Sequence, residues 1–191
     1  NQELDTIDNR VGELVANTSY RFIGTTFNQN DMKLVVMYSD DGSFWYCPNP
    51  QGDFTSTIGN GTLRDPSMLK RDDTFFICYT KIAWGTGHVI GYCHTKDFRN
   101  FEEEEMLDLG SQFIKIWAPE FFRDSITKKE YIVFNGSTSV SGTDDFRGYL
   151  QEISINDNVI SLIGQPVQIT GDMTNQNAID FSMIQDNGKY Y

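Results

Sequence analysis

Three features of the sequence predict an all-β fold assembled from propeller blades. Aromatic residues make up 14% of the chain, and Gly, Asn, Asp and Thr are abundant, a composition that favours strands and turns over helix. From about residue 20 onward, short apolar runs alternate with turn residues. Similar stretches recur about every 55–60 residues, and such a period in an all-β chain indicates four-stranded propeller blades.

Eight runs are rich in the β-branched and aromatic residues that form strands. They are RFIGTTF (21–27), LVVMYS (34–39), FWYC (44–47), FFICYT (75–80), VIGYCHT (89–95), YIVFNGS (131–137), YLQEISI (149–155) and VISLIG (159–164). These runs account for roughly two complete blades with pieces of blades on either side. A propeller is stabilised by closing its ring, so we expect the chain to be an excerpt of a longer protein.

Two internal similarities fix the register of the repeat. The stretches DPSM from residue 65, APEF from residue 118 and DFSM from residue 180 each begin an apolar strand followed by a polar turn and an aromatic strand. Asp65, Ala118 and Asp180 therefore hold equivalent positions at the heads of the innermost strands. The stretches YSDDGSFW (38–45) and HTKDFRNF (94–101) share a Ser/Thr-x-Asp turn, in which Asp41 and Asp97 cap the turn on the opposite face of the propeller.

The N-terminal segment has a different period. Leu4, Ile7, Val11 and Leu14 recur at heptad spacing, which predicts that residues 1–18 are the end of a coiled-coil stem and that residues 19–191 are part of the propeller. Two heptads are too short for an isolated stable helix. An ordinary amphipathic helix that packs on its own domain is the alternative.

Charge and cysteine content narrow the classes of partner. The net charge is −12, from 15 basic and 27 acidic residues, and no Lys/Arg cluster is present, so we expect no nucleic-acid partner. No run of apolar residues is long enough to span a membrane, and the sequence has no signal-peptide profile. Cys47, Cys78 and Cys93 lack metal-ligand spacing and are expected to be free thiols. A Cys78–Cys93 disulfide across one hairpin is the alternative.

The head of each innermost strand lies at one mouth of the axial channel, so Asp65 and Asp180 place two carboxylates at that mouth. A pair of carboxylates that face one cleft is what glycoside hydrolysis requires. The loops 81–89 and 136–148 return to the same mouth and border it. No metal site and no cofactor are predicted; a calcium ion at the ring is conceivable, but no loop supplies a full set of ligands.

Three further residues are candidates for contact with a sugar. Trp84, in a Gly-rich loop at the mouth, is as suited to stacking on a sugar as to packing. Trp117, at a strand head, is better suited to wall packing. Glu120 follows Pro119, and strand alternation turns its side chain away from the direction of Asp65, which favours a structural hydrogen bond over a site role.

The same stretches resemble the five-bladed propellers of glycoside hydrolase family 43. RDPSML (64–69) resembles the Asp-Pro motif of the family's first blade, IWAPEFF (116–122) the Trp-Ala-Pro motif of the second, and AIDFSMIQDNGKYY (178–191) the Ile-Asp-Pro-Ser motif of the third. The resemblance implies that Asp65 is the general base and that Asp180 tunes the pKa of the acid. In this family the acid is a Glu of the fourth blade, which lies outside the chain, and Phe181 stands where the family has proline.

A heptad stem that leads into a five-bladed propeller also resembles the receptor-binding proteins at the tail tip, or baseplate, of staphylococcal-type siphophages. That resemblance implies a homotrimer joined through the stem, other tail proteins as partners, and a virion protein made in the host cytoplasm that recognises a cell-wall glycan such as wall teichoic acid. The alternative location is a secreted protein.

Three hypotheses of function follow. The first, which the sequence favours, is a phage attachment protein that binds a glycan at the mouth without cleaving it; linked weak sites would then gain avidity through the trimer. The second is an inverting glycosidase that acts on arabinan- or xylan-like glycans, with Asp65 activating water. The third is a structural platform whose ring carboxylates are remnants of an ancestral site. The candidate site residues are Asp65, Trp84, Trp117, Glu120 and Asp180.

Overall fold

A computed structural model describes residues 20–139, 145–172, 174 and 176–191. This part of the chain is all β, with no helix, and therefore has none long and apolar enough to cross a membrane. The strands are β1 (Phe22–Asn28), β2 (Lys33–Ser39), β3 (Arg64–Arg71), β4 (Thr74–Thr80), β5 (Val89–Thr95), β6 (Phe101–Asp108), β7 (Lys115–Arg123), β8 (Glu130–Ser137), β9 (Phe146–Asn156), β10 (Val159–Gln168), β11 (Gln185–Asp186) and β12 (Lys189–Tyr190). The coiled-coil stem predicted at residues 1–18 lies outside the described residues.

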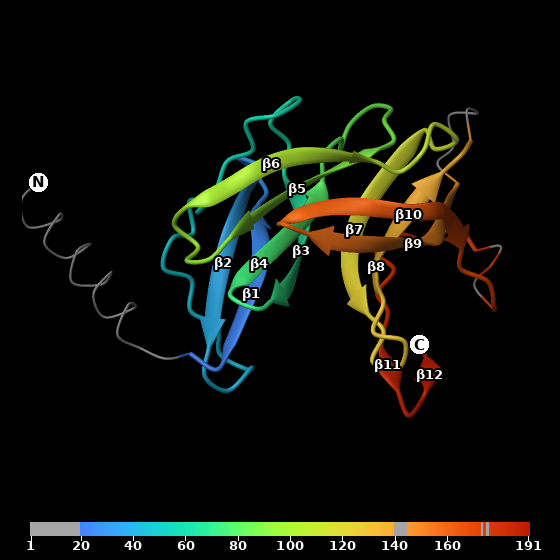
Figure 1. Cartoon of the computed structure of the whole chain (residues 1–191). Helices are drawn as coiled ribbons and strands as arrows, with labels where there is room; N and C mark the ends of the chain where they lie inside the picture. Colours follow the sequence, from blue (N-terminus) through green and yellow to red (C-terminus); the bar gives the residue numbers. More distant parts are fainter. Residues whose placement is uncertain (1–19, 140–144, 173, 175) are drawn as a thin grey trace, which may run out of the picture.

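Two four-stranded antiparallel sheets form the body of the molecule (Figure 1). One has the order β3-β4-β5-β6 and the other β7-β8-β9-β10, so each is a consecutive meander of the kind found in a propeller blade. The innermost strands β3 and β7 pack against each other. The pairs β1–β2 and β11–β12 lie on either side of the two complete blades, and the described sheets do not close into a ring.

Burial explains the character of individual strands. Strand β4 reads as a nearly continuous apolar run because an apolar cluster packs against each face of its sheet, and all but one of its residues are buried. Strand β6 is the outer edge of its blade and carries the run from Glu102 to Glu105. Charges on an edge strand oppose pairing with another chain. The acidic run therefore suits the place of β6 in the sheet.

The core lies between neighbouring blades. One apolar cluster joins the two complete blades; it is built around Phe76, Ile90, Ile116, Ile132 and Phe134. A second cluster joins β1 and β2 to the first complete blade, with Leu34, Val36, Leu63, Ile77 and Tyr79 at its centre. Because each blade is buried against its neighbour, contacts between blades position the heads of the inner strands.

The three residues predicted at the heads of inner strands share an unusual backbone conformation, although the segment after Asp180 becomes strand only at β11 (Gln185–Asp186). Asp65, Ala118 and Asp180 have φ angles of 49°, 46° and 60°, in the left-handed region that non-glycine residues seldom adopt. In β3 and β7 the pairing register also shifts at this point, which marks a bulge at Asp65 and at Ala118. The equivalence predicted from DPSM, APEF and DFSM is confirmed in the backbone.

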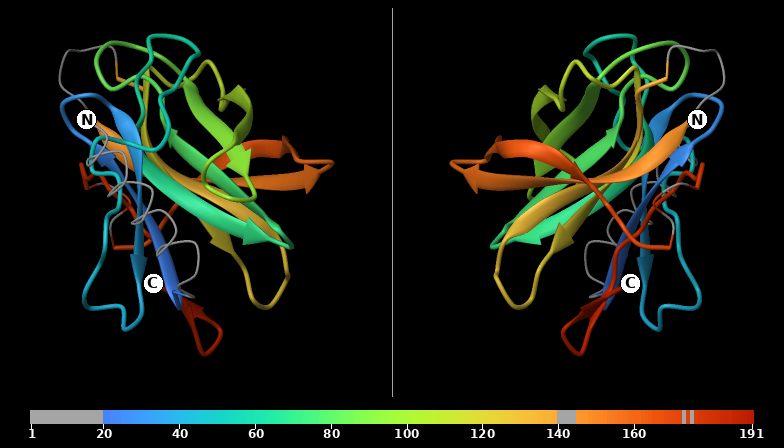
Figure 2. Two further views of the ribbon diagram at one scale, coloured as in Figure 1. Left: turned by 90° about the vertical axis from the view of Figure 1, so that its left-hand side faces the viewer. Right: turned by 90° about the vertical axis from the view of Figure 1, so that its right-hand side faces the viewer.

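The turns of the described residues also lie where the repeat predicted. The inner strands begin at the end that is uppermost in Figure 1, and the turn between β7 and β8 lies at the lower end with β11 and β12; Figure 2 shows the same separation from two sides. The predicted caps are confirmed at the opposite end from the strand heads. Asp41 accepts hydrogen bonds from the N–H groups of Ser43 and Phe44, both at 2.8 Å. Asp97 accepts equivalent bonds within its own turn, which lower its pKa to about 2.

The disulfide alternative is wrong. Cys78 pairs with Tyr92 and Cys93 with Ile77, so the two thiols are one register step apart and lie on opposite faces of the sheet. Cys78 packs in the core between the two blades, and Cys93 in the core beside β1 and β2. All three cysteines are free, as expected.

Candidate active site

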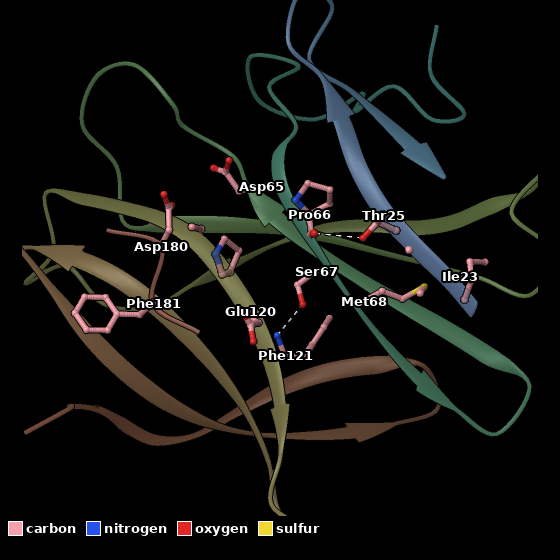
Figure 3. Close-up of a pocket in the computed structure, with 13 residues that line it drawn as sticks. Ile23, Thr25, Asp65, Pro66, Ser67, Met68, Glu120, Phe121, Asp180 and Phe181 are labelled. Carbon is pink, nitrogen blue, oxygen red and sulfur yellow. Dashed lines mark hydrogen bonds between the residues drawn. The ribbon is translucent and has the colours of Figure 1, made fainter. Parts of the chain in front are cut away.

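Three carboxylate residues line a hollow of about 610 Å³ along the inner strands. Asp65 and Asp180 lie near one another at its upper end, and Glu120 lies further along it (Figure 3). We call this space the channel hollow; its wall also includes Ser67 and Phe121. The structure thus brings together Asp65, Glu120 and Asp180.

A buried threonine holds the Asp65 carboxylate. The Thr80 hydroxyl donates to Asp65 Oδ2 at 2.8 Å, and the same hydroxyl oxygen accepts the N–H of Ala118 at 2.8 Å. Thr80 is 1% exposed, so water does not compete for these bonds. The strand head of the second blade is therefore connected through one side chain to the carboxylate of the first.

The electrostatic environment of Asp65 favours the protonated form. Burial raises the pKa of the carboxyl, and the nearby Asp180 raises it further. The hydrogen bond from Thr80 and the charge of Arg64 lower it, but the net direction is upward. A raised pKa makes the ionised carboxylate a stronger base once its proton is lost.

Glu120 lies elsewhere than strand alternation predicted. Alternation turned its side chain away from Asp65, whereas the structure lines one hollow with both residues. The two-residue period was misapplied: Glu120 lies two residues after Ala118, the equivalent of Asp65, so alternation itself places the two side chains on one face. The carboxylate also makes a structural hydrogen bond: it accepts the Ser182 hydroxyl at 2.9 Å, from the next strand head along the chain.

The two tryptophans lie at a second hollow, of about 240 Å³, that shares Asp65 and Asp180 with the first. We call it the mouth hollow; its other lining residues include Arg64, Trp84, Trp117 and Ile179. Trp84 is 71% exposed, and the Arg64 guanidinium carbon lies 5.4 Å from its ring centre. The ring of Trp117 stacks on Phe146 at 4.5 Å between centres, so it forms part of the wall.

The departure from proline at residue 181 has a structural counterpart. The Phe181 N–H donates to Asn135 Oδ1 at 3.3 Å, a bond that proline could not make. Asn135 is fully buried, and its amide also donates to the carbonyl of Trp117 at 3.1 Å. The Phe181 ring packs against Gly148, where an added Cβ would approach ring carbon Cδ1 to 2.9 Å. Asn135 therefore joins the second and third strand heads, much as Thr80 joins the first and second.

Sequence reasoning missed Thr80, Arg64 and Asn135. Thr80 and Asn135 pair in register with Arg64 and Trp117, the residues directly before two strand heads. Polar side chains at the ends of otherwise apolar strands were the available signal. Among the described residues, no group of three or more His, Cys, Asp or Glu side chains is arranged to hold a metal ion.

Two carboxylates at strand heads of propeller blades are the kind of arrangement that glycoside hydrolysis uses. A family model described as a probable glycosyl hydrolase domain, related to glycoside hydrolase family 43, matches residues 14–191. The chain belongs to this family.

Solved structures agree on the fold. A thermostable family 43 glycoside hydrolase is 16% identical with a TM-score of 0.60, and the match covers 91% of this chain and 64% of that one. The endo-arabinase of Bacteroides thetaiotaomicron is 14% identical with a TM-score of 0.58 over 92% of this chain and 63% of the enzyme. The family 43 protein BlXynB of Bacillus licheniformis is 17% identical with a TM-score of 0.55, and the match covers 88% of this chain and 32% of that one.

The chain thus spans less than two thirds of these proteins. A search of curated proteins found no match.

Proposed function

We propose that this chain forms part of an inverting glycoside hydrolase, with Asp65 as the general base. The observation that carries the proposal is the setting of Asp65: a left-handed strand head, a fixed hydrogen bond from buried Thr80, and a second carboxylate, Asp180, at the same mouth. Non-glycine residues in this backbone region cost about 1–3 kcal/mol each and cluster at functional sites.

In the proposed reaction, each proton transfer and bond change has a defined donor and acceptor. Asp65 takes a proton from water while the water oxygen bonds to the anomeric carbon and the glycosidic C–O bond breaks. The leaving oxygen gains its proton from a general acid, for which this chain offers no assigned residue. Asp180 stays close enough to Asp65 to influence its charge. Inversion needs a gap between base and acid that admits one water molecule.

The substrate class that we propose is a neutral arabinan- or xylan-like glycan. Its support is the family of the chain together with the fold shared with an endo-arabinase. An overall charge of −12 disfavours polyanionic substrates.

The test uses the full-length protein that contains this chain. Arabinan and xylan oligosaccharides are incubated with wild type, Asp65→Asn and the control Asp41→Asn, and released sugar is measured. We expect release by wild type and by Asp41→Asn, and a loss of about 10²-fold or more in Asp65→Asn. Equal release by Asp65→Asn and wild type would remove Asp65 from the role of base.

Glycan binding without cleavage is the second candidate. The exposed ring of Trp84 at the mouth favours it, because an open aromatic face beside carboxylates can stack on a sugar that is not cleaved. Attachment of a phage to wall teichoic acid through a trimeric stem is one form of this function and remains a prediction. Binding of purified teichoic acid without sugar release would support this form.

A further inference from the structure

The two carboxylates at the strand heads are held in different ways. The Thr80 hydroxyl bonds directly to the Asp65 carboxylate at 2.8 Å, whereas the Asp180 carboxylate makes no hydrogen bond within the described part of the chain. Asp180 also has a φ angle of 60°, a conformation that persists only where surrounding contacts enforce it. The position of the Asp180 carboxylate therefore depends on contacts made by the residues next to it.

Two hydrogen bonds to the second blade hold the residues directly after Asp180. The Phe181 N–H donates to Asn135 Oδ1 at 3.3 Å, and the Ser182 hydroxyl donates to Glu120 Oε1 at 2.9 Å. Strand pairing begins only further along, beside β11. The bond to Glu120 is the shorter of the two, and hydrogen bonds to a carboxylate are stronger than those between neutral groups. Glu120 is therefore a main constraint on the segment that carries Asp180.

The repeat places Glu120 at the same level as two serines. Ser67, Glu120 and Ser182 each lie two residues after a strand head. Ser67 of the first blade accepts the N–H of Phe121 at 3.0 Å, and Glu120 of the second accepts the Ser182 hydroxyl, so each inner strand is bonded to the next at this level. The second blade has alanine at its head and carries its carboxylate two residues deeper in the channel hollow.

The separation of the Asp65 and Asp180 carboxylates has an electrostatic consequence. Like charges near one another disfavour ionisation, and Asp180 adds to the effect of burial in raising the pKa of Asp65, whereas Arg64 lowers it. Within the described residues, the charged side chains that line the two hollows are Arg64, Asp65, Glu120 and Asp180 (Figure 3). If Asp180 moves away from Asp65, the pKa of Asp65 falls.

We propose that Glu120 is a positioning residue that sets the separation of the Asp65 and Asp180 carboxylates through its hydrogen bond with Ser182. The inference rests on the proposed function only for what the two carboxylates do, and it deepens that proposal by adding a residue that does not itself touch the reacting atoms. Without this bond, Asn135 alone holds the residues after Asp180, and the Asp180 carboxylate moves away from Asp65.

The first experiment follows the titration of the Asp65 carboxyl by carbon NMR in the full-length protein that contains this chain. Ser182→Ala removes the bond and keeps the Glu120 side chain, whereas Glu120→Gln removes the acid and keeps an acceptor for Ser182. We expect the Asp65 midpoint to move to lower pH in Ser182→Ala and to stay at the wild-type value in Glu120→Gln. A shift in Glu120→Gln with none in Ser182→Ala would mean that Glu120 acts through its charge, and it would overturn the proposal.

The second experiment separates positioning from a purely structural role. Ser182 is exposed, so Ser182→Ala should have the urea unfolding midpoint of wild type and of the control Ser161→Ala, an exposed serine on the outer strand β10. Glu120→Ala should lower the Asp65 titration midpoint as Ser182→Ala does, and the double variant should shift it no further, because both substitutions remove the same bond. A lower unfolding midpoint with an unchanged Asp65 titration would refute the proposal.

Kinetics distinguish this inference from the proposed hydrolase. On arabinan or xylan oligosaccharides, kcat/KM should fall about 10- to 100-fold in Ser182→Ala, with its acid limb at lower pH, and should stay near wild type in Glu120→Gln. The expected NMR shifts without cleavage by the full-length protein would sustain the positioning role while the hydrolase proposal fails. Cleavage that Asp65→Asn abolishes, but that keeps its rate and pH profile in Ser182→Ala, would reject the positioning role alone.

Discussion

Thr80→Val removes the hydroxyl that connects two strand heads and keeps the shape of the side chain. In the wild type that hydroxyl donates to Asp65 and accepts from the N–H of Ala118, each at 2.8 Å. Valine replaces the hydroxyl with a methyl group in a position that is 1% exposed. Both partners lose their bond, and the fold loses a link between the first and second blades.

The structure sets the size of the effect. The N–H of Ala118 bonds to a hydroxyl that is itself buried, and its loss of that acceptor costs about 1–3 kcal/mol. The Asp65 carboxylate lines an open hollow where water can replace the hydroxyl, so its share is at the low end, about 1 kcal/mol. We expect the free energy of unfolding to fall by about 2–4 kcal/mol in Thr80→Val. Thr80→Ser keeps the hydroxyl and should lose only about 1 kcal/mol for one methyl group.

The same substitution has a signed effect on proton binding. The Thr80 hydrogen bond favours ionised Asp65, so its loss raises the pKa of Asp65 further. In an active hydrolase the acid limb of the kcat/KM profile then moves to higher pH. A group whose folded pKa is raised adds stability in acid and loses it as pH rises through that pKa, so the deficit of Thr80→Val should be larger at neutral pH than below about 3.8.

Urea unfolding at several pH values and carbon NMR of the Asp65 carboxyl measure the two effects separately. The NMR titration does not depend on activity, so it reports on Thr80 whether or not the protein cleaves glycans. If Thr80→Val and Thr80→Ser share one stability and one Asp65 titration midpoint, the connection through Thr80 has no energetic role and the reasoning is wrong.

Two further predictions concern hydrogen bonds in the body of the fold. Tyr79 donates to Glu104 at 2.5 Å; burial raises the pKa of Glu104, but hydrogen bonds from its neighbours outweigh burial and lower it. Tyr79→Phe should therefore reduce the unfolding free energy by about 1 kcal/mol near neutral pH, with the difference from wild type narrowing as the pH falls through the lowered pKa; a constant difference would contradict this. Asn135→Leu leaves the carbonyl of Trp117 and the N–H of Phe181 without partners and should cost about 1–3 kcal/mol in urea unfolding; an unfolding free energy equal to that of wild type would contradict this.

Much of the fold could be predicted because it repeats. The period of the strand heads located Asp65, Ala118 and Asp180, and each has the same left-handed backbone. Turn chemistry placed Asp41 and Asp97, since an Asp two residues after Ser or Thr accepts hydrogen bonds from the backbone N–H groups of its own turn. Local rules need no knowledge of how the blades pack.

The site was predictable only where local rules sufficed. Asp65 and Asp180 stand out as charges at the heads of apolar strands. Glu120 was misjudged because it was not counted from Ala118, the equivalent of Asp65, two residues before it, which puts both side chains on the same face. Thr80 bonds to Ala118 of the next blade, and Arg64 lies against the ring of Phe27, which is far away in the sequence. One sequence does not reveal such contacts.

Hydrogen bonds between blades hold the strand heads that carry the charged residues of the mouth. Each carboxylate or strand head is bonded to the neighbouring blade: Asp65 through Thr80 to Ala118, and Trp117 through Asn135 to Phe181. A strained backbone persists only where surrounding structure over-determines it, and these bonds supply that constraint from a different blade in each case. The buried side chains of Thr80 and Asn135 therefore hold the strand heads in place. For this reason we expect substitutions at Thr80 or Asn135 to alter stability first.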